Sequence, residues 1–120
     1  MTEMFVYMTA ADKSEATEIG RTLVHERLAA CVNILDNMVS LYWWEGSVQQ
    51  GSEAVLIAKT TSELVEPLVE RVKQLHSYQC PCVVALPIQA GNADYLAWIR
   101  SETRTMGPEE EPPMNADKRR

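Results

Sequence analysis

The chain has 120 residues, 46% of them hydrophobic, and a formal net charge of −6. This length suits a single domain with one core, no run approaches the about 18 apolar residues of a membrane span, and an acidic balance argues against nucleic acid, whose phosphates attract lysine and arginine. The N-terminus lacks the basic stretch and small-residue cleavage site of a signal peptide, so we expect a soluble cytoplasmic protein that does not attach to membranes.

The first two predicted elements are a strand and a helix. Residues 4–8 form a short apolar run with aromatic and β-branched side chains, which predicts a buried strand. Asp12 followed by Glu15 matches a capping box, a pattern in which two side chains bind free N–H groups at the start of a helix. Apolar residues then recur at roughly helical spacing and predict a helix over residues 14–28.

A long strand and its return follow. Residues 30–44 carry apolar side chains with a period of two, which predicts one strand that is bent or bulged at residues 36–37. Residues 45–47 predict a turn, and residues 48–52 suit the second strand of a small hairpin. Residues 54–59 form a continuous apolar run, which is typical of a central strand covered on both faces.

The second half of the chain predicts a helix, a strand and a final helix. Candidate N-cap residues occur at 60–63, and the helix that follows has one apolar face that extends to His76. Proline is tolerated only near a helix start, so this helix either begins next to Pro67 or has an irregular first turn. Residues 82–88 predict the last main strand, and Asn92 is expected to cap the final helix.

This order of elements predicts a fold of the α+β class. A βαββαβ order with an extra C-terminal helix is the ferredoxin-like sandwich, in which helices cover one face of an antiparallel sheet. The other face needs a cover too, and for a domain of this size we expect another subunit. We assign the domain to residues 1–102 and the proline-, glycine- and charge-rich residues 103–120 to a poorly ordered tail.

One imidazole and two thiols lie close together in the stretch His76-Ser-Tyr-Gln-Cys-Pro-Cys82. Soft metal ions prefer such ligands, and positions two apart on an extended chain face the same side, so Cys80 and Cys82 can form one edge of a metal site with His76. The alternative is a helix that ends at His76, followed by two small packed cysteines. The spacing is not a standard zinc pattern and a fourth ligand is missing, so both interpretations stay open.

Two further polar residues occupy strand positions where a function is possible. Cys31 begins the long strand and is either a small packing residue or a thiol at a subunit cleft. We expect the three cysteines to be reduced, since their number is odd and two are too close to bridge easily. Lys59 ends the central strand, where its charge needs a partner: a salt bridge to Glu45 or Glu53, or an anion in a cleft.

Four aromatic residues suit packing in the core or in a subunit interface, where aromatic side chains are enriched. They are Trp44, Tyr78, Tyr95 and Trp98. The alternative is a wall on which a small ligand stacks. The sequence contains no nucleophile elbow, glycine-rich phosphate loop or His-Glu-x-x-His motif. We therefore expect neither enzyme activity nor an organic cofactor.

Six short motifs occur in order along the predicted domain. They are Ala30-Cys-Val-Asn-Ile34, Ser40-x-Tyr42-x-Trp44-Glu-Gly46, Lys59-Thr60, His76-x-Tyr78-x-x-Pro81, Leu86-Pro87-Ile88 and Asn92-x-x-Tyr95-Leu-x-Trp98. At these spacings the chain resembles the CutA family, the divalent-cation tolerance proteins, from residue 4 to residue 102. No motif is specific alone, but six in register are.

The resemblance implies a ferredoxin-like subunit in a tight homotrimer, cytoplasmic in bacteria and similar in architecture to the nitrogen-regulatory PII proteins. It also implies a link to copper and other divalent metals, seen as altered tolerance. The chain departs from the family pattern at two positions: Ser77 replaces the usual proline, and Cys82 stands where an acidic residue is common. A thiol at that position favours softer ions such as Cu(I) or Zn(II).

Two hypotheses of function follow. In the first, a homotrimer binds copper or another divalent cation near subunit clefts, through His76 together with Cys31, Cys80 or Cys82. In the second, a PII-like scaffold or signalling trimer binds a small ligand or a partner in its clefts. Metal effects would then be indirect, and Lys59 and the aromatic residues would matter more than the thiols.

Overall fold

The computed structural model describes residues 2–105, and its elements follow the predicted order. A short 3-10 helix, η1, precedes the second α-helix. The elements are β1 (Glu3–Ala10), α1 (Lys13–His25), β2 (Cys31–Trp44), β3 (Ser47–Thr61), η1 (Ser62–Leu64), α2 (Val65–Leu75), β4 (Val83–Pro87) and α3 (Ala93–Glu102).

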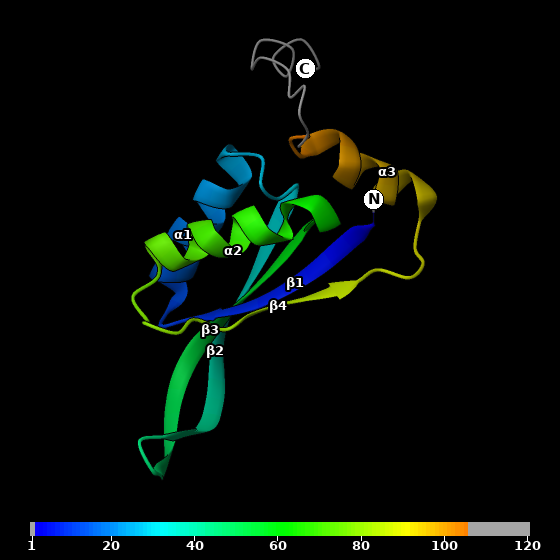
Figure 1. Ribbon diagram of the computed structural model, residues 1–120. Coiled ribbons are helices and arrows are strands. Elements are labelled where there is room, and N and C mark those ends of the chain that lie inside the picture. Colours follow the sequence, from blue (N-terminus) through cyan, green and yellow to red (C-terminus); the bar gives the residue numbers. More distant parts are fainter. Residues whose placement is uncertain (1, 106–120) are drawn as a thin grey trace.

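The four strands form one sheet in the order β2-β3-β1-β4, and every neighbouring pair is antiparallel. Figure 1 shows α1 and α2 together on one side of this sheet, and α3 at the end where β1 begins. The far halves of β2 and β3 project beyond the body as a long hairpin (Figure 1). This is the predicted ferredoxin-like α+β fold with its extra C-terminal helix, and the prediction is confirmed.

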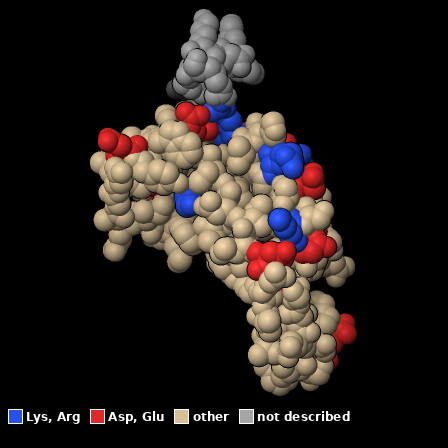
Figure 2. All heavy atoms as spheres, turned by 180° about the vertical axis from the view of Figure 1, so that it is seen from behind, with Lys and Arg blue, Asp and Glu red and all other residues tan. Residues whose placement is uncertain are grey.

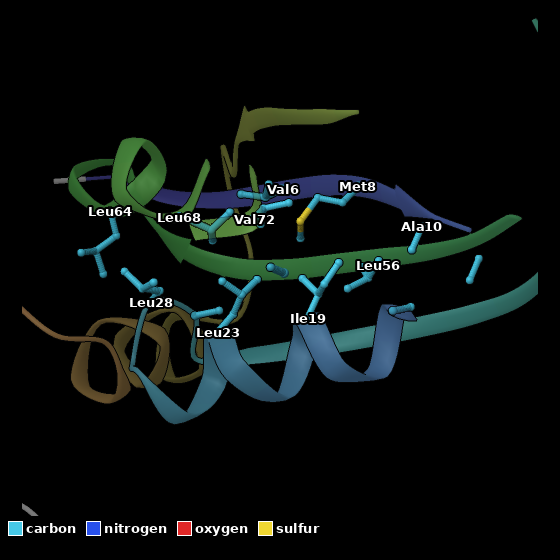
Figure 3. Packing of buried hydrophobic residues seen from close by; sticks show 14 residues of the cluster. Val6, Met8, Ala10, Ile19, Leu23, Leu28, Leu56, Leu64, Leu68 and Val72 are labelled. Atoms are coloured by element: carbon cyan, nitrogen blue, oxygen red, sulfur yellow. The ribbon is translucent and has the colours of Figure 1, made fainter. Parts of the chain in front are cut away.

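The core lies between the sheet and the two helices. Val6 and Met8 of β1 and Leu56 of β3 point toward α1, where Ile19 and Leu23 meet them (Figure 3). All of these side chains are at most 1% exposed. Because successive strand residues point to opposite faces, the residues of β1 between the core positions face away from α1 and α2.

The start of α1 forms as predicted, and its end does not. The Asp12 side chain accepts a hydrogen bond from the Glu15 N–H at 2.8 Å, and the Glu15 carboxylate accepts one from the Ala11 N–H at 2.9 Å. The helix stops at His25, three residues before the predicted end. Arg27 has a φ of 60°, and this left-handed residue turns the chain out of the helix.

That turn satisfies the carbonyls at the end of α1. The N–H of Leu28 donates to the carbonyl of Leu23 at 2.9 Å, and the N–H of Arg27 donates to the carbonyl of Val24 at 3.0 Å. This pair of bonds is a Schellman motif, which usually places glycine where Arg27 stands. The apolar Leu28 looked like a helical position in the sequence, but it is buried by the turn.

The hairpin contains the predicted bulge and turn. Between Leu35 and Met38 the register of β2 shifts by one residue against β3, and Asn37 has a φ of 62°. At the tip, Glu45 and Gly46 both have positive φ, which is the signature of a two-residue type I′ turn. The two segments expected at 48–52 and 54–59 form one continuous strand, β3, which pairs with β2 from Ser47 to Lys59 on either side of the bulge.

The second half differs from the prediction at element boundaries. A 3-10 turn leads into α2, which begins at Val65 with Pro67 in its first turn, so the regular helix starts near Pro67 and the segment before it is irregular, as the two alternatives expected. At Thr61, among the candidate N-caps, the side chain makes no capping bond. Strand β4 is Val83–Pro87, one residue shorter at each end than expected. Asn92 does cap α3, since its side chain accepts from the Asp94 N–H.

The body of the fold continues past the expected boundary at residue 102. Thr103 is buried, and its hydroxyl donates to the carbonyl of Ile99 at 3.0 Å. The N–H of Arg104 donates to the carbonyl of Arg27 at 2.9 Å, which ties the end of α3 to the turn after α1. Residues 106–120, the rest of the predicted tail, lie outside the described residues.

Candidate functional site

A hollow of about 680 Å³ opens on the face of the sheet that α1 and α2 leave uncovered. Its position follows from β1, where Tyr7 and Thr9 line the hollow while Val6 and Met8 point into the core. The walls come from three strands and from the connection between α2 and β4. The lining residues are Tyr7, Thr9, Met38, Ser40, Leu41, Tyr42, Trp44, Glu53, Tyr78, Gln79, Cys80 and Cys82.

The bulge in β2 decides which side chains of the hairpin reach this hollow. Before it, Val32 and Ile34 pack against the core, so the even-numbered residues face α1. The extra residue at 36–37 reverses the alternation, because two residues of β2 then oppose one residue of β3. After the bulge the even-numbered residues from Met38 to Trp44 face the hollow instead, and Met38 pairs directly with Glu53.

Tyr78 is held in the wall of the hollow by two hydrogen bonds. Its hydroxyl donates to the Glu53 carboxylate at 2.8 Å, and its backbone N–H donates to Nδ1 of His76 at 3.1 Å. The rings of His76 and Tyr78 also pack with centroids 4.6 Å apart. Burial and the nearby carboxylate of Glu53 raise the pKa of Tyr78, so this phenol stays protonated and keeps donating at neutral pH.

His76 lies behind this wall, where it stabilises the connection between α2 and β4. Its side chain is 1% exposed, and Nε2 lies 2.7 Å from the carbonyl of Thr9. Since Nδ1 accepts from the Tyr78 N–H, Nε2 carries the proton and donates to Thr9. Both ring nitrogens are occupied, so the predicted use of His76 as a metal ligand does not fit this geometry. His76 does lie at the C-terminal end of α2, as the alternative interpretation predicted. Its ring, however, bonds to the carbonyl of Thr9 on β1 and not to a free carbonyl of the helix.

Cys80 and Cys82 line the same hollow and are both exposed and free. Burial, and then the charge of Glu53, raise the pKa of the Cys82 thiol. Within residues 2–105, no three histidine, cysteine, aspartate or glutamate side chains lie close enough together to hold a metal ion. Within one subunit, the thioether of Met38 lines the same hollow as these two thiols.

The other predicted site residues form a second cluster at the start of β2. Lys59 donates to the side-chain oxygen of Asn33, because Lys59 pairs in register with Cys31 and lies beside Asn33. Of the two alternatives for Lys59, the salt bridge to Glu45 or Glu53 does not form. The carboxylate of Glu53 is bound by Tyr78 instead. Lys59 therefore does not line the hollow.

Cys31 belongs to this second cluster and not with the other cysteines. Its sulfur lies 3.4 Å from the hydroxyl of Tyr95, and that hydrogen bond, aided by burial, raises the pKa of Tyr95 to about 12. The rings of Tyr95 and Trp98 stack at 5.5 Å between centroids. Since Tyr95 and Trp98 are on α3, this cluster attaches α3 to the sheet.

Sequence reasoning thus found four lining residues of the hollow, namely Trp44, Tyr78, Cys80 and Cys82, and missed others. Tyr7 and Met38 were treated only as strand residues, and Glu53 only as a partner for Lys59. The signal that could have found Met38 is the predicted bulge itself, since one extra residue reverses which side chains share a face. No local pattern indicates that Tyr7 faces the same space.

Large apolar side chains remain exposed on the sheet and the hairpin. Trp43 is 74% and Trp44 is 54% exposed, and the hairpin appears as an arm with few charged atoms in Figure 2. The other exposed large apolar residues on the strands are Leu35, Val39, Leu41, Tyr42, Val48, Val84 and Leu86, while Val24, Tyr95 and Trp98 are exposed on helices. Within residues 2–105, no helix is both long and apolar enough to span a membrane.

These features define a class: a ferredoxin-like α+β protein with an uncovered sheet face, a long aromatic hairpin and a hollow where the two meet. The chain matches the CutA1 divalent ion tolerance protein family over residues 4–102. It belongs to that family, and the resemblance seen in the sequence is confirmed.

Several relatives carry the same family name. "Protein CutA 1, chloroplastic" from Oryza sativa subsp. japonica is 46% identical over 99 residues, which are 82% of this chain and 56% of the relative. "Divalent-cation tolerance protein CutA" from Thermus thermophilus is 46% identical over 101 residues, which are 84% of this chain and 98% of the relative. The chain spans about half the length of the curated plant relatives that it matches.

Solved structures of the family share this fold. The divalent cation tolerance protein of Thermus thermophilus has a TM-score of 0.82 at 46% identity, over 84% of this chain and 98% of that one. CutA1 from Oryza sativa has a TM-score of 0.86 at 42% identity, over 88% of this chain and 97% of that one.

Proposed function

We propose that this chain forms a homotrimer that binds copper or another divalent cation and so contributes to cation tolerance. Membership of the family supports the tolerance role. The observation that supports metal binding is that Cys80 and Cys82 line a single hollow as free, exposed thiols. Soft thiolate ligands select copper and zinc over hard cations. In this proposal the protein binds an ion and catalyses no reaction.

The trimer is supported by the surface that one subunit leaves exposed. Apolar side chains as large as Trp43 and Trp44 are rarely grouped on the surface of a monomer, and such patches favour protein contacts. The strands β2 and β4 form the two edges of the sheet, and their free N–H and C=O groups can pair with another copy. A contact from one edge to the other edge of the next copy closes into a ring when the rotation fits.

The assembly also bears on the metal. One subunit supplies the two thiols and the thioether of Met38, all on the same hollow. Further ligands would come from a neighbouring subunit at the same place. A thiol must lose its proton to bind a metal, and the pKa of Cys82 is raised, so apparent affinity should increase as pH rises. Free thiols persist in reducing compartments, which supports the cytoplasm as the location.

The test is a competition titration of the reduced, metal-free protein with Cu(I), Cu(II) and Zn(II). We expect tight binding of about one ion per subunit, lost in a variant that combines Cys80→Ser and Cys82→Ser. The matched control is Cys31→Ser, because Cys31 is also a free thiol but lies in the other cluster. Equal binding by wild type and the double variant would overturn the proposal, and sedimentation of the same samples reports the oligomeric state.

A second candidate function is a PII-like trimer that binds a small organic ligand. The observation that favours it is the hollow itself, whose about 680 Å³ lies in the range of small-molecule sites. In that case the aromatic wall matters, and Lys59, which lies outside the hollow, does not contact the ligand. If cells keep their copper tolerance when both thiols are removed, that result would favour this candidate over metal binding.

A further inference from the structure

The hollow has an aromatic wall that metal binding does not use. Four ring side chains line it: Tyr7, Tyr42, Trp44 and Tyr78. Trp44 and Tyr42 project from the hairpin, Tyr7 comes from the middle of β1, and Tyr78 comes from the loop before β4. Rings from three separate parts of the chain therefore surround one space. Aromatic faces carry partial negative charge and attract cations that approach within about 6 Å.

Within one subunit, the charge in the hollow has one sign. Of the twelve residues that line it, Glu53 alone is formally charged, and none is lysine, arginine or histidine. Its carboxylate accepts one hydrogen bond, from the Tyr78 hydroxyl at 2.8 Å. A carboxylate has about four acceptor positions, so Glu53 keeps capacity to bind another donor. Burial raises the pKa of both Tyr78 and Cys82, and the negative charge of Glu53 raises them further.

Hydrogen bonds hold the wall where it meets this charge. Tyr78 is fixed at its hydroxyl by Glu53 and at its backbone N–H by His76, and His76 is itself bound to the carbonyl of Thr9. A ring held in place loses little entropy when a ligand binds, which favours affinity. His76 is buried between Thr9 and the Tyr78 backbone, and from there it holds Tyr78 in position.

From this arrangement we propose that the hollow binds a small organic cation, an amine or a quaternary ammonium group, against its aromatic wall with Glu53 as the counter-charge. Aromatic side chains around an acidic group are the usual means of recognising such ions. A metal ion would need ligands that the aromatic wall lacks, and an anion would be repelled by Glu53. The inference does not need metal binding or the thiols; it rests on the second candidate function and specifies its small organic ligand as a cation.

The experiment is an NMR titration of the full-length, assembled protein with tetramethylammonium, using tert-butanol as a neutral molecule of similar size. We expect tetramethylammonium to shift the ring resonances of Tyr78 and Trp44 and tert-butanol not to. Glu53→Gln keeps an acceptor for Tyr78 and should weaken binding by about tenfold or more. The matched control is Glu45→Gln, which removes an exposed acidic group at the hairpin tip, outside the hollow.

Two further variants separate this inference from the metal proposal. Tyr7→Leu keeps an apolar side chain but removes one ring and should also weaken binding. The Cys80→Ser, Cys82→Ser variant should bind tetramethylammonium like wild type even where it no longer binds copper. Equal binding of tetramethylammonium and tert-butanol, or no effect of Glu53→Gln, would overturn the inference, whatever the copper titration gives.

Discussion

Two side chains in the hollow respond to the charge of Glu53. Burial raises the pKa of the Cys82 thiol, and the carboxylate of Glu53 raises it further. The hydroxyl of Tyr78 has the same causes and a direct hydrogen bond in addition. The thiolate is the reactive form of cysteine, so Cys82 should be slow to react at neutral pH.

Removing that charge should make Cys82 more reactive. In a background of Cys31→Ser and Cys80→Ser, we expect Glu53→Gln to increase the rate of Cys82 alkylation by iodoacetamide at about pH 8 severalfold. Mass spectrometry of the alkylated protein over time measures the rate. Glu45→Gln is the matched control and should leave it unchanged. If both glutamine variants react at the wild-type rate, the charge of Glu53 does not reach the thiol.

Glu15 connects the start of α1 to the residue before it and to the loop that follows α2. Its two oxygens accept from the N–H groups of Ala11 and Ser77, and it lies 3.9 Å from His76. Burial by itself would raise the pKa of Glu15, but these N–H groups and His76 outweigh it, and the pKa lies below its ordinary value of 4.5. Glutamine has one acceptor oxygen and cannot replace both bonds.

This lowered pKa predicts a loss of stability in acid. A carboxyl group whose pKa is depressed by folding contributes its full stability above about pH 4.5 and loses it as pH falls through the depressed value. At pH near 7, Glu15→Gln should lower the free energy of unfolding by about 1–3 kcal/mol. The difference from wild type should shrink toward zero in strong acid.

Urea unfolding at fixed protein concentration, repeated from neutral to acid pH, measures this difference. Glu18→Gln is the control, since Glu18 lies exposed on the same helix. A constant gap between Glu15→Gln and wild type at all pH values would show that the carboxylate's ionisation is not what stabilises the fold.

At the scale of elements, α1 approaches β2 closely at one glycine. A Cβ added to Gly20 would lie 3.0 Å from Cγ1 of Val32, which is shorter than ordinary contacts allow. Elsewhere in a helix, replacing glycine by alanine stabilises by about 0.5–1 kcal/mol. Here the gain is opposed by overpacking, which destabilises by about 1–3 kcal/mol.

Gly20→Ala should therefore not stabilise the protein, because the added methyl group would clash with Val32. We expect a net loss of about 1 kcal/mol in the wild-type background. In a Val32→Ala background the clash is absent, and Gly20→Ala should stabilise by a few tenths of a kcal/mol to about 1 kcal/mol. Chemical unfolding of the four proteins in this double-mutant cycle gives the coupling. Additive effects would refute the close packing of α1 on β2.

At the scale of the whole molecule, the exposed hairpin and sheet face set the expected behaviour. The molecule extends over 50 Å in its long direction, and the hairpin projects from one end (Figure 1). An isolated two-stranded hairpin is marginally stable in water, and this one carries several exposed aromatic rings. Contact with neighbouring subunits would both cover those rings and support the hairpin.

Truncating one of these rings should loosen the proposed trimer. Trp44→Ala should weaken subunit association by about 2 kcal/mol or more, as expected for a central interface tryptophan. Sedimentation velocity over a dilution series measures the shift toward smaller species. Val24→Ala, which shortens an exposed apolar side chain on α1, is the control and should not change association. A Trp44→Ala protein that stays fully associated on dilution would count against the assembly.

The sequence by itself determined the order and nature of the elements. The Asp12 and Asn92 caps, the bulge at Asp36-Asn37 and the turn at Glu45-Gly46 all appeared as predicted. These features depend on groups a few residues apart, and their physical causes are therefore visible in a short stretch of sequence. The end of α1 was misplaced because Arg27 adopts a conformation that glycine usually takes.

Only the tertiary structure decided which side chains share the hollow. Tyr7, Met38, Glu53 and Cys82 come from four segments, and strand register and the bulge bring them to one face. His76 was expected beside the thiols but is buried against β1, because its two nitrogens find Thr9 and the Tyr78 backbone there. The Thr9 partner is set by packing between residues 67 positions apart in the chain, and no local spacing of residues encodes it.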